Sequence, residues 1–277
     1  MKGDLHCHTT LSDGSLGIED IIVQAKRTGL DFISITDHDT MSSISRAKVL
    51  GERHGIITVP GVELSAWDKK RDRKVHILCY APSKPDRLEG ICRKACEIRT
   101  ACAKEMIDKV MKLYPITRES VMKHVGGAKS IFKSHIMHAL IDYGYSTHFY
   151  GKLNDELFNR KNGSCIVERE YPDVNYVIDL IHSARGAAVL AHPVLYDSFE
   201  LLEELAAEGR IDGAEVYHYT ADRSHQARLS EIARKYNIAE TGGSDFHGLY
   251  NLSPVHIGSY TTDGENLDKI IKLTSKK

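Results

Sequence analysis

The chain has 277 residues, a formal net charge of -1, and hydrophobic and charged fractions of 42% and 27%, which are ordinary values for a globular protein. This length allows one large domain, or one domain that carries an insertion. The near-neutral charge argues against broad electrostatic capture of nucleic acid or anionic membranes, but it is compatible with a small basic pocket.

Nothing in the sequence indicates membrane insertion or export. The chain has no apolar run of about eighteen residues, and its N-terminus lacks the basic-then-apolar pattern of a signal peptide. Six cysteines in a chain of this size do not indicate a disulfide framework. We therefore expect a cytoplasmic protein with reduced thiols, no membrane association and no obligate protein partner.

The first predicted strand contains Asp4-Leu5-His6-Cys7-His8. Side chains at positions i and i+2 of a strand point to the same face, so His6 and His8 project together and form half of a metal site. The alternative is a pair of ordinary histidines on a solvated strand face. Cys7 points to the opposite face, and we do not expect it to be a ligand.

Helices and strands alternate over the next seventy residues or so. The predicted elements are a helix over 18–28, a strand over 32–36, a helix over 42–54, a strand over 56–59 and a strand over 75–80. His38 directly follows the second strand of the chain, Glu63 lies just past the third, and His76 lies in the fourth.

The pattern changes between residues 83 and 170, where no strand is predicted. One long amphipathic helix extends from about residue 88 to 113 and ends at Pro115, and shorter helices are predicted over 117–125, 131–143 and 153–159. We interpret 83–170 as a helical insertion that would cap the substrate. The main domain would then consist of residues 1–82 and 171–277.

The alternation resumes after the predicted insertion. Helices are expected over 173–184, 198–208 and 221–236, and strands over 187–191, 213–217 and 238–241. Seven strands separated by helices predict a parallel sheet. An open doubly wound sheet would fit this order, but the chain lacks a glycine-rich dinucleotide fingerprint. A closed barrel fits better, because polar residues end nearly every strand and barrel active sites gather there.

Nitrogen and oxygen donors recur at or beside these strand ends. The candidate metal ligands are His6, His8, Asp13, His38, Glu63, His76, His192, Asp245 and His247. This set exceeds one tetrahedral zinc site and suits two or three ions of zinc, manganese or iron. Ions roughly 3.5–4 Å apart are a common device for hydrolysing phosphate esters. The alternative is that these are unrelated core or surface histidines. It would require six of the fifteen histidines to fall at or beside strand ends without a shared role.

A series of motifs resembles those of the PHP family, the polymerase and histidinol phosphatase superfamily, in the family's order. They are Asp4-Leu5-His6-Cys7-His8, Ser12-Asp13-Gly14, Ile35-Thr36-Asp37-His38-Asp39, Gly61-Val62-Glu63, Val75-His76-Ile77, Ala191-His192-Pro193 and Gly243-Ser244-Asp245-Phe246-His247. Two more segments, Arg169-Glu170-Tyr171-Pro172 and Glu215-Val216-Tyr217-His218, are similar to those of stand-alone phosphoesterases acting on nucleotide-like phosphates.

The resemblance implies an α/β fold, a distorted TIM-like (β/α)7 barrel with the helical insertion as a cap. It also implies three ion positions and places His38, Asp245 and His247 in catalysis. The first ion would take His6, His8, Glu63 and Asp245, the second Asp13, His38 and His247, and the third His76, His192 and a shared Glu63. A metal-bridging hydroxide would attack phosphorus, with Asp37 and Asp39 as candidates for orienting the ligands. Asp37 could instead cap the following helix.

Asp13 stands where some relatives have histidine, which makes manganese or iron as plausible as zinc. The segment Phe132-Lys133-Ser134-His135-Ile136 resembles an Arg-Pro-His-Ile segment of related enzymes, so Lys133 and His135 are expected to reach the substrate. A solvated helix face is the alternative for both. Arg169, His218 and Arg223 are further candidates for substrate binding.

The leading hypothesis is a phosphoesterase that removes a phosphate monoester from a small, nucleotide-like metabolite, such as the 3′-phosphate of a nucleoside 3′,5′-bisphosphate. Processing of short oligonucleotides is a variant of this hypothesis. A histidinol-phosphate phosphatase is the second candidate, and a non-catalytic accessory PHP module is the third. Related enzymes often carry an arginine after the His-Pro pair, whereas Val194-Leu195-Tyr196 contains none, which leaves the substrate open.

Overall fold

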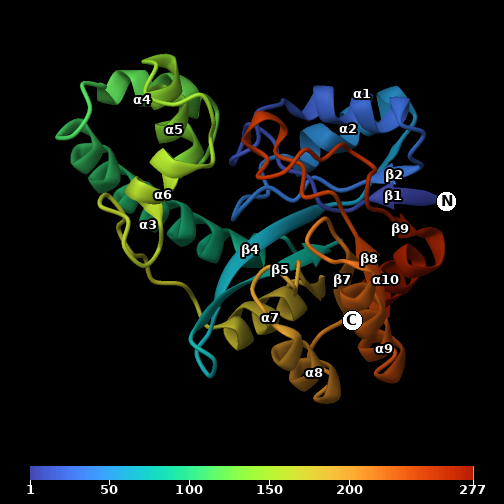
Figure 1. The fold of residues 1–277 in the computed structure, drawn as a ribbon. Helices are drawn as coiled ribbons and strands as arrows, with labels where there is room; N and C mark the ends of the chain where they lie inside the picture. The colour runs from blue at the N-terminus through green and yellow to red at the C-terminus, as the bar shows by residue number, and fades with distance from the viewer. Residues whose placement is uncertain (277) are drawn as a thin grey trace.

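The computed structural model describes residues 1–276 as a mixed α/β fold with two sheets and ten α-helices (Figure 1). The strands are β1 (Lys2–Asp4), β2 (Phe32–Ile33), β3 (Ile57–Thr58), β4 (Gly61–Asp68), β5 (Arg73–Tyr80), β6 (Ala187–Leu190), β7 (Gly213–Tyr217), β8 (Ala239–Gly242) and β9 (Thr262–Asp263). The helices are α1 (Ile18–Arg27), α2 (Ile44–His54), α3 (Asp86–Met111), α4 (Arg118–Val125), α5 (Lys133–Asp142), α6 (Lys152–Phe158), α7 (Val174–Ser183), α8 (Phe199–Ala207), α9 (Arg223–Lys235) and α10 (Gly264–Lys276), with a 3-10 helix η1 (Gly248–Tyr250).

The two sheets meet at their strand ends. One sheet has the order β3-β2-β1-β9 and the other the order β4-β5-β6-β7-β8. Single parallel bridges join Cys7, after β1, to Phe246, after β8, and His38, after β2, to Glu63 in β4. Both junctions between the sheets therefore lie beside predicted metal ligands.

The prediction of an entirely parallel sheet is wrong in both sheets. The pairs β1/β2, β2/β3, β6/β7 and β7/β8 are parallel, but β9 is antiparallel to β1, and β5 is antiparallel to both β4 and β6. A turn over residues 69–72 connects β4 and β5, and so short a connection allows only an antiparallel hairpin.

The hairpin also corrects the position of Glu63. The sequence places this residue beyond a strand over 56–59, but that strand is only Ile57–Thr58, and Glu63 lies inside the unpredicted strand β4. Neither β9 nor α10 was predicted from the sequence. His6 and His8 follow β1 rather than lie within it. The other nine helices agree with the predicted ranges to within a few residues.

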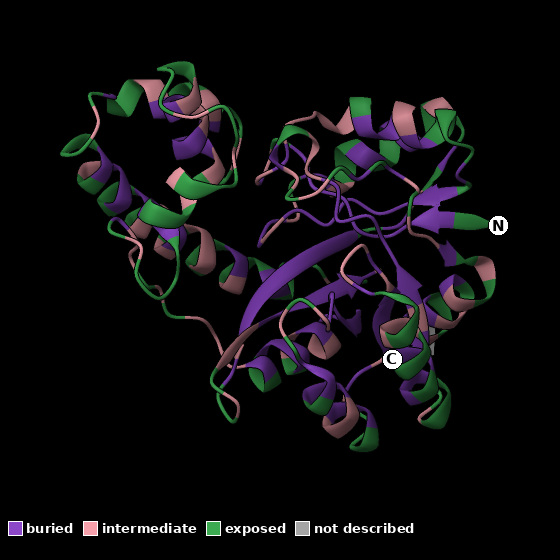
Figure 2. Cartoon of the chain, in the orientation of Figure 1, coloured by how far each residue is buried: buried purple, intermediate pink, exposed green. Residues whose placement is uncertain are grey.

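Alternation along β5 separates two hydrophobic clusters. Val75, Ile77 and Cys79 pack against the helices that cover the sheet, whereas Leu78 and Tyr80 pack with residues of β6 and β8 in an inner cluster. His76 lies on the inner face with Leu78 and Tyr80, because it is separated from them by steps of two residues. Figure 2 shows that the strands around this interior are largely buried. The inner face therefore changes from apolar to metal-binding chemistry along a single strand.

Helices α3–α6 form a lobe beside the sheets, at the upper left of Figure 1. Residues 83–170 contain helices and loops but no strand, as predicted. The lobe has a hydrophobic cluster of its own, which includes Ile107, Val121, Ile136 and Leu140. None of the described helices combines the length and apolarity needed to cross a membrane.

We propose that residues 83–170 pack as a separate unit, and Leu140→Ala tests this. Leu140 is fully buried in the lobe, so its truncation should lower the free energy of unfolding by about 2–5 kcal/mol. Urea denaturation followed by circular dichroism measures the loss. Leu113→Ala is the matched control, because Leu113 is 57% exposed and should change stability by less than about 0.5 kcal/mol. Equal effects of the two substitutions would contradict the assigned packing.

Candidate metal centre

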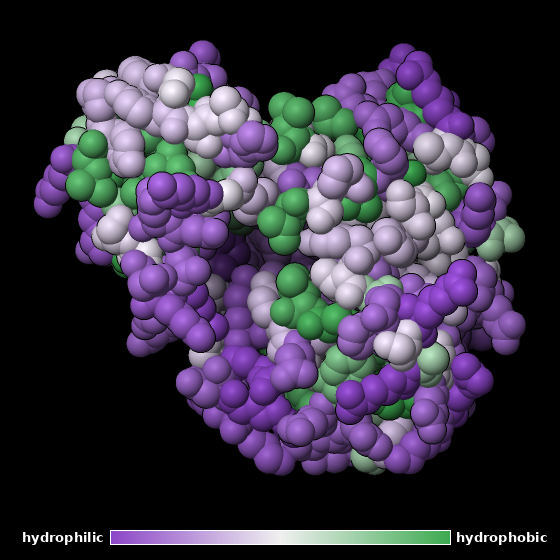
Figure 3. Space-filling view, in the orientation of Figure 1, coloured by the Kyte–Doolittle hydropathy of each residue, from purple (hydrophilic) through white to green (hydrophobic). Residues whose placement is uncertain are grey.

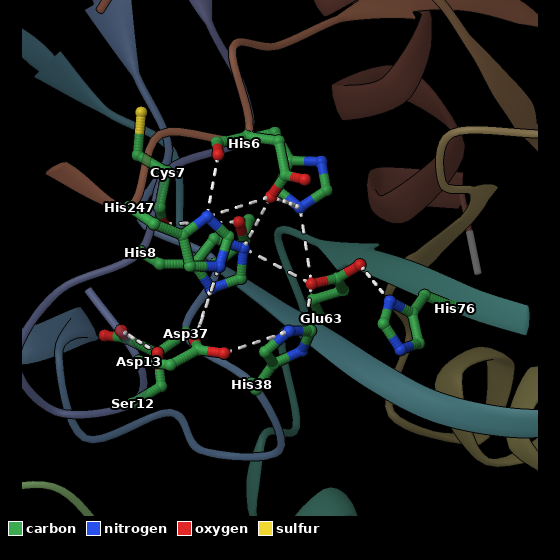
Figure 4. Close-up of polar contacts among 12 residues, drawn as sticks. His6, Cys7, His8, Ser12, Asp13, Asp37, His38, Glu63, His76 and His247 are labelled. Atoms are coloured by element: carbon green, nitrogen blue, oxygen red, sulfur yellow. Dashed lines mark hydrogen bonds and ion pairs between the residues drawn. The ribbon is translucent and has the colours of Figure 1, made fainter. Parts of the chain in front are cut away.

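The structure brings the nine sequence-predicted donors into one buried cluster. They come from the N-terminal segment, the loop before α1, the segments after β2, β6 and β8, and strands β4 and β5. The atoms of these residues lie within ion-pair distance of one another in an unbroken series of contacts. Figure 4 shows His6, His8, His38 and His76 directed at the carboxylate of Glu63.

The first ligand set is His6, His8, Glu63 and Asp245. Nε2 of His6 and Nε2 of His8 each lie 3.3 Å from Glu63 Oε2, and 3.3 and 3.1 Å from Asp245 Oδ1. All four atoms are buried, and none has a hydrogen-bond partner among the residues that the structure describes. Buried polar atoms are normally paired, because desolvation without a partner is costly. Their convergence without hydrogen bonds fits a bound cation.

The second set surrounds Asp13. His247 Nε2 lies 3.4 Å from Asp13 Oδ1, and His38 Nε2 lies 3.8 Å from Asp13 Oδ2. The structure adds His8 to this set, because its Nδ1 atom is 3.8 Å from Asp13 Oδ1. Asp13 Oδ1 and His8 Nδ1 are again buried without hydrogen-bond partners. His8 therefore faces both sets through its two ring nitrogens.

The third set shares Glu63 with the first. Glu63 Oε1 lies 2.6 Å from His76 Nδ1 and 2.9 Å from His192 Nε2, while its Oε2 atom faces His6, His8 and, at 2.9 Å, His38. The two histidine nitrogens of this set are 3.4 Å apart. The two carboxylate oxygens thus point to different groups of nitrogens, which is the arrangement of a bridging ligand. The donors present fit two or three divalent ions.

Charge in the cluster supports the same conclusion. Burial opposes ionisation of Glu63, but the surrounding histidines, first His38, hold the pKa of its carboxyl group well below the usual range. Burial also opposes a charge on His8, yet Asp245 and Glu63 raise the pKa of its imidazole to about 10. The carboxylates therefore favour a proton on the His6 and His8 rings in the metal-free protein, whereas burial lowers the pKa of His38 and of His76. Binding of a cation would release such protons.

Glu215 contacts the cluster, and it was given no role in the sequence analysis, although its segment, Glu215-Val216-Tyr217-His218, was among the motifs. Its Oε1 atom lies 2.9 Å from His6 Nδ1, and its Oε2 atom accepts a 2.7 Å hydrogen bond from the backbone N–H of His192. Because a carboxylate only accepts, Nδ1 of His6 carries the proton and Nε2 is left for the cluster. A lone glutamate in the buried strand β7 was the available signal, since charged residues rarely lie in such strands unpaired.

Asp37 positions the loop that carries Asp13. It accepts hydrogen bonds of 2.7 Å from both the backbone N–H of Thr9 and the hydroxyl of Ser12. The alternative role as a helix cap is wrong, because α2 begins at Ile44 with Ser43 at its N-cap. Asp39 accepts a 2.9 Å hydrogen bond from the backbone N–H of Ser65 and pairs with Arg99.

The predicted substrate residues have different surroundings. His218 is fully buried, with Nε2 3.5 Å from Asp245 Oδ2 and Nδ1 2.8 Å from the hydroxyl of Thr220. His135 is also buried, and its Nδ1 atom accepts a hydrogen bond from the backbone N–H of Phe132, while burial lowers the pKa of its ring to about 4. Because of its contact with Asp245, His218 lies beside the predicted metal ligands, whereas His135 lies in the lobe.

The three cationic candidates for substrate binding, Lys133, Arg169 and Arg223, are less buried than His218 and His135. Lys133 is exposed at the first residue of α5, and Arg169 is half-buried with its guanidinium 4.6 Å above the ring of Tyr171. Arg223 is exposed at the first residue of α9 and makes no ion pair with the ligand cluster in the described part of the chain. Substrate contacts by all three stay predictions.

Comparisons with known proteins identify the family. The family model described as PHP domain matches residues 4–276. The chain belongs to the PHP family. The family resemblance found in the motifs is thereby confirmed.

Two curated relatives extend over most of the chain. A protein of Eggerthella lenta named phosphoribosyl 1,2-cyclic phosphate 1,2-diphosphodiesterase is 35% identical, over 93% of this chain and 98% of its own. A protein of Chromobacterium violaceum named 3′,5′-nucleoside bisphosphate phosphatase is 27% identical, over 88% of this chain and 86% of its own. A crystal structure from Bifidobacterium adolescentis, described as a metal-dependent phosphoesterase, is 28% identical with a TM-score of 0.87, over 98% of this chain and 95% of its own.

Glu63→Gln tests the shared carboxylate. The amide keeps the shape of the side chain but removes the negative charge that faces two ligand sets, so the protein should lose at least one divalent ion per chain. Elemental analysis after reconstitution and desalting measures the stoichiometry. Glu200→Gln, at a position with a largely exposed side chain, is the control. Retention of every ion by a folded Glu63→Gln protein would contradict the bridging role.

Glu215→Gln tests the positioning of His6. The amide can offer Nδ1 of His6 a donor as well as an acceptor, which removes the constraint on the ring's protonation. We expect metal affinity to fall by about 10-fold to 100-fold. Competition with a chromophoric chelator measures this affinity without any substrate. Glu203→Gln is a surface control, and equal affinities of the two variants would disprove the role of Glu215.

Proposed function

We propose that this protein hydrolyses a phosphate monoester of a small, nucleotide-like metabolite, with the 3′-phosphate of a nucleoside 3′,5′-bisphosphate as the leading candidate. The chain is a PHP-family hydrolase that acts on phosphoric ester bonds. What we propose beyond this is the substrate, the number of bound metal ions and the role of each residue.

One observation carries the proposal. Glu63 directs its two oxygens toward different histidine groups, within a cluster of nitrogen and oxygen donors that contains no sulfur. Divalent ions held there would supply a nucleophile at neutral pH and neutralise charge on the phosphoryl oxygens. We assign the first position to His6, His8, Glu63 and Asp245, the second to Asp13, His38 and His247, and the third to His76, His192 and Glu63.

The protein's own residues would prepare the site for that chemistry. Glu215 fixes the ring of His6, and Asp37 fixes the loop that carries Asp13, so the ligands are held before a substrate arrives. His218 has one ring nitrogen held by Thr220, which leaves Nε2 available to a phosphoryl oxygen beside Asp245. We propose that His218, His135, Lys133, Arg169 and Arg223 contact the substrate.

The lobe would contribute the binding surface for the rest of the substrate. We propose a (β/α)7 barrel formed by residues 1–82 and 171–277, with residues 83–170 as a cap over its ligand-bearing end. Figure 3 shows a hydrophilic recess between the lobe and the rest of the molecule. A hydrophilic wall suits a phosphorylated metabolite better than an apolar ligand.

Three names among the relatives narrow the substrate class. The proteins of Eggerthella lenta and Chromobacterium violaceum carry the names given above, and a protein of Haemophilus influenzae, 29% identical over 89% of this chain, is named 5′-3′ exoribonuclease. All three names refer to phosphate esters of ribose or of ribonucleotides. This common chemistry supports a ribose phosphate and disfavours histidinol phosphate. A non-catalytic module is disfavoured by the nine converging donors.

The test is a phosphate-release assay on the metal-loaded protein with His38→Ala as the inactive variant. The panel contains adenosine 3′,5′-bisphosphate, phosphoribosyl 1,2-cyclic phosphate, a 5′-phosphorylated oligonucleotide and histidinol phosphate. Turnover of the bisphosphate, with a loss of at least about 100-fold in His38→Ala, is expected because His38 faces both Asp13 and Glu63. Products from the cyclic diester and oligonucleotide are followed by chromatography.

Each other outcome has a defined meaning. Preferred turnover of the cyclic diester, the oligonucleotide or histidinol phosphate would replace the proposed substrate. Bound metal without any turnover would favour the accessory module. Full activity of His38→Ala would overturn the ligand assignment. His54→Ala is the control, because His54 lies at the end of α2, paired with Glu19 rather than with the cluster.

A further inference from the structure

Three cations near the metal centre have no acidic partner. In the described part of the chain, Lys74, Lys133 and Arg169 make neither an ion pair nor a hydrogen bond, although many other cations do. Arg99, for comparison, pairs with Asp39 and donates to Ser130. The charges of Lys74 and Arg169 oppose one another. Glu63 and Asp39 lie near enough to offset part of this repulsion without forming an ion pair, and an anionic ligand would relieve the rest.

Lys74 is on the ligand-bearing face of the hairpin. It precedes His76 by two residues on β5, so both side chains point to the inner face, and its cross-strand partner on β4 is Trp67. The Lys74 ammonium lies between two aromatic rings, 5.4 Å from the centroid of Tyr196 and 5.7 Å from that of Tyr171. It is therefore held in place by ring contacts, which leave its N–H donors free.

Tyr196 connects this ammonium to the metal centre. The centroid of its ring lies 5.3 Å from the ring centroids of both His76 and His192. One aromatic ring therefore separates the Lys74 ammonium from the third ligand set. A sugar ring is of similar width, so a ribose phosphate with one phosphate at the metals can direct a second one toward Lys74.

The segment that carries Arg169 is fixed to the same hairpin. The backbone N–H of Trp67 donates a 2.8 Å hydrogen bond to the carbonyl oxygen of Pro172, and the rings of Trp67 and Tyr171 stack at 5.7 Å. The guanidinium of Arg169 lies over Tyr171, 4.6 Å from its centroid. Stacking occupies the face of a guanidinium and leaves its edge donors available to a phosphate. Lys133 is the exposed first residue of α5, and its ammonium lies close enough to Lys74 and Arg169 for their positive charges to act on it.

We propose that Lys74, Arg169 and Lys133 form a subsite for a second phosphate of the substrate, one that is bound but not hydrolysed. This inference rests on the proposed function and makes it more specific. The expected substrates carry a second phosphate that is separated from the reacting phosphate by about the width of one sugar ring. Lys74 then distinguishes such substrates from simple monophosphates.

The kinetic test compares adenosine 3′,5′-bisphosphate with adenosine 3′-monophosphate, which differ only in the 5′-phosphate. For the metal-loaded enzyme, Lys74→Gln should lower kcat/KM for the bisphosphate by about 10-fold to 100-fold, because one charged contact is lost. The monophosphate should change by less than about threefold. Lys74→Arg should recover most of the loss, and Lys48→Gln, at an exposed position on α2, is the control for net charge.

A binding test does not depend on turnover. Trp67 is the only tryptophan of the chain, and it lies directly across from Lys74, so its fluorescence reports on the proposed subsite. Adenosine 5′-monophosphate, the expected product, should change this fluorescence in the metal-loaded wild type. The midpoint should move to at least tenfold higher concentration in both Lys74→Gln and Arg169→Gln.

The two tests separate failure of the subsite from failure of the proposed function. If Lys74→Gln reduces turnover of both adenosine substrates equally, or leaves the fluorescence titration unchanged, the subsite is wrong while the phosphatase activity stands. If the wild type hydrolyses neither substrate but the titration depends on Lys74 and Arg169, the subsite stands and the proposed reaction is wrong.

Discussion

A buried carboxylate surrounded by imidazoles is the interaction on which the rest of the structure depends. Glu63 is fully buried, and its two oxygens lie within 3.3 Å of nitrogens from five histidines. Those histidines come from the N-terminal segment, the segment after β2, strand β5 and the segment after β6. A lone buried carboxylate would be strongly destabilising. The Glu63 carboxylate therefore needs compensating positive charge, and four separated segments of the chain supply the groups that provide it.

Holding these segments together requires structural support away from the ligands. Asp4 accepts hydrogen bonds from the backbone N–H groups of His6, Ser244 and Gly258, which ties the first ligand segment to the last. His192 and Asp245 have φ values of 29° and 52°, in the left-handed region that side chains other than glycine rarely adopt. Such strain persists only where surrounding contacts impose it, and it is common at functional sites.

The sequence was sufficient to predict which donors come together but not the paths by which they meet. His38, His192 and Asp245 follow strands whose ends meet at one side of the sheets, as barrel topology predicts. The same logic gave the wrong position for Glu63, which lies inside the antiparallel β4–β5 hairpin. Its alternation of Val62, Leu64 and Ala66 with polar neighbours was visible in the sequence, but the expectation of parallel strands obscured it.

Residues that act through a neighbour were the least predictable. Glu215 and Lys74 were not among the predicted site residues, and each gains its role from side chains that it meets across the fold. Glu215, in β7, contacts His6 of the N-terminal segment. Lys74, in β5, contacts Tyr196 of the segment after β6. Single-residue roles of this kind depend on tertiary register, which no local periodicity encodes. Propensity and spacing therefore indicated the donors that converge, but not the side chains that support them.

Tyr250 is one of several side chains that join the lobe to the segments carrying the predicted ligands. Phe132 of the lobe stacks on His38, and Arg99 of α3 pairs with Asp39. Tyr250 belongs to η1, which directly follows His247, and its hydroxyl lies 2.8 Å from His138 Nδ1 on α5. Its carbonyl oxygen accepts a 3.0 Å hydrogen bond from the Tyr150 hydroxyl, and its ring contacts Phe149. A displacement of the lobe must therefore move Tyr250 or break these contacts, and Tyr250 is three residues from a predicted ligand. The lobe, for which we propose substrate contact, and the cluster proposed to bind the ions are thus linked through these contacts, so a shift of α5 would be transmitted toward His247.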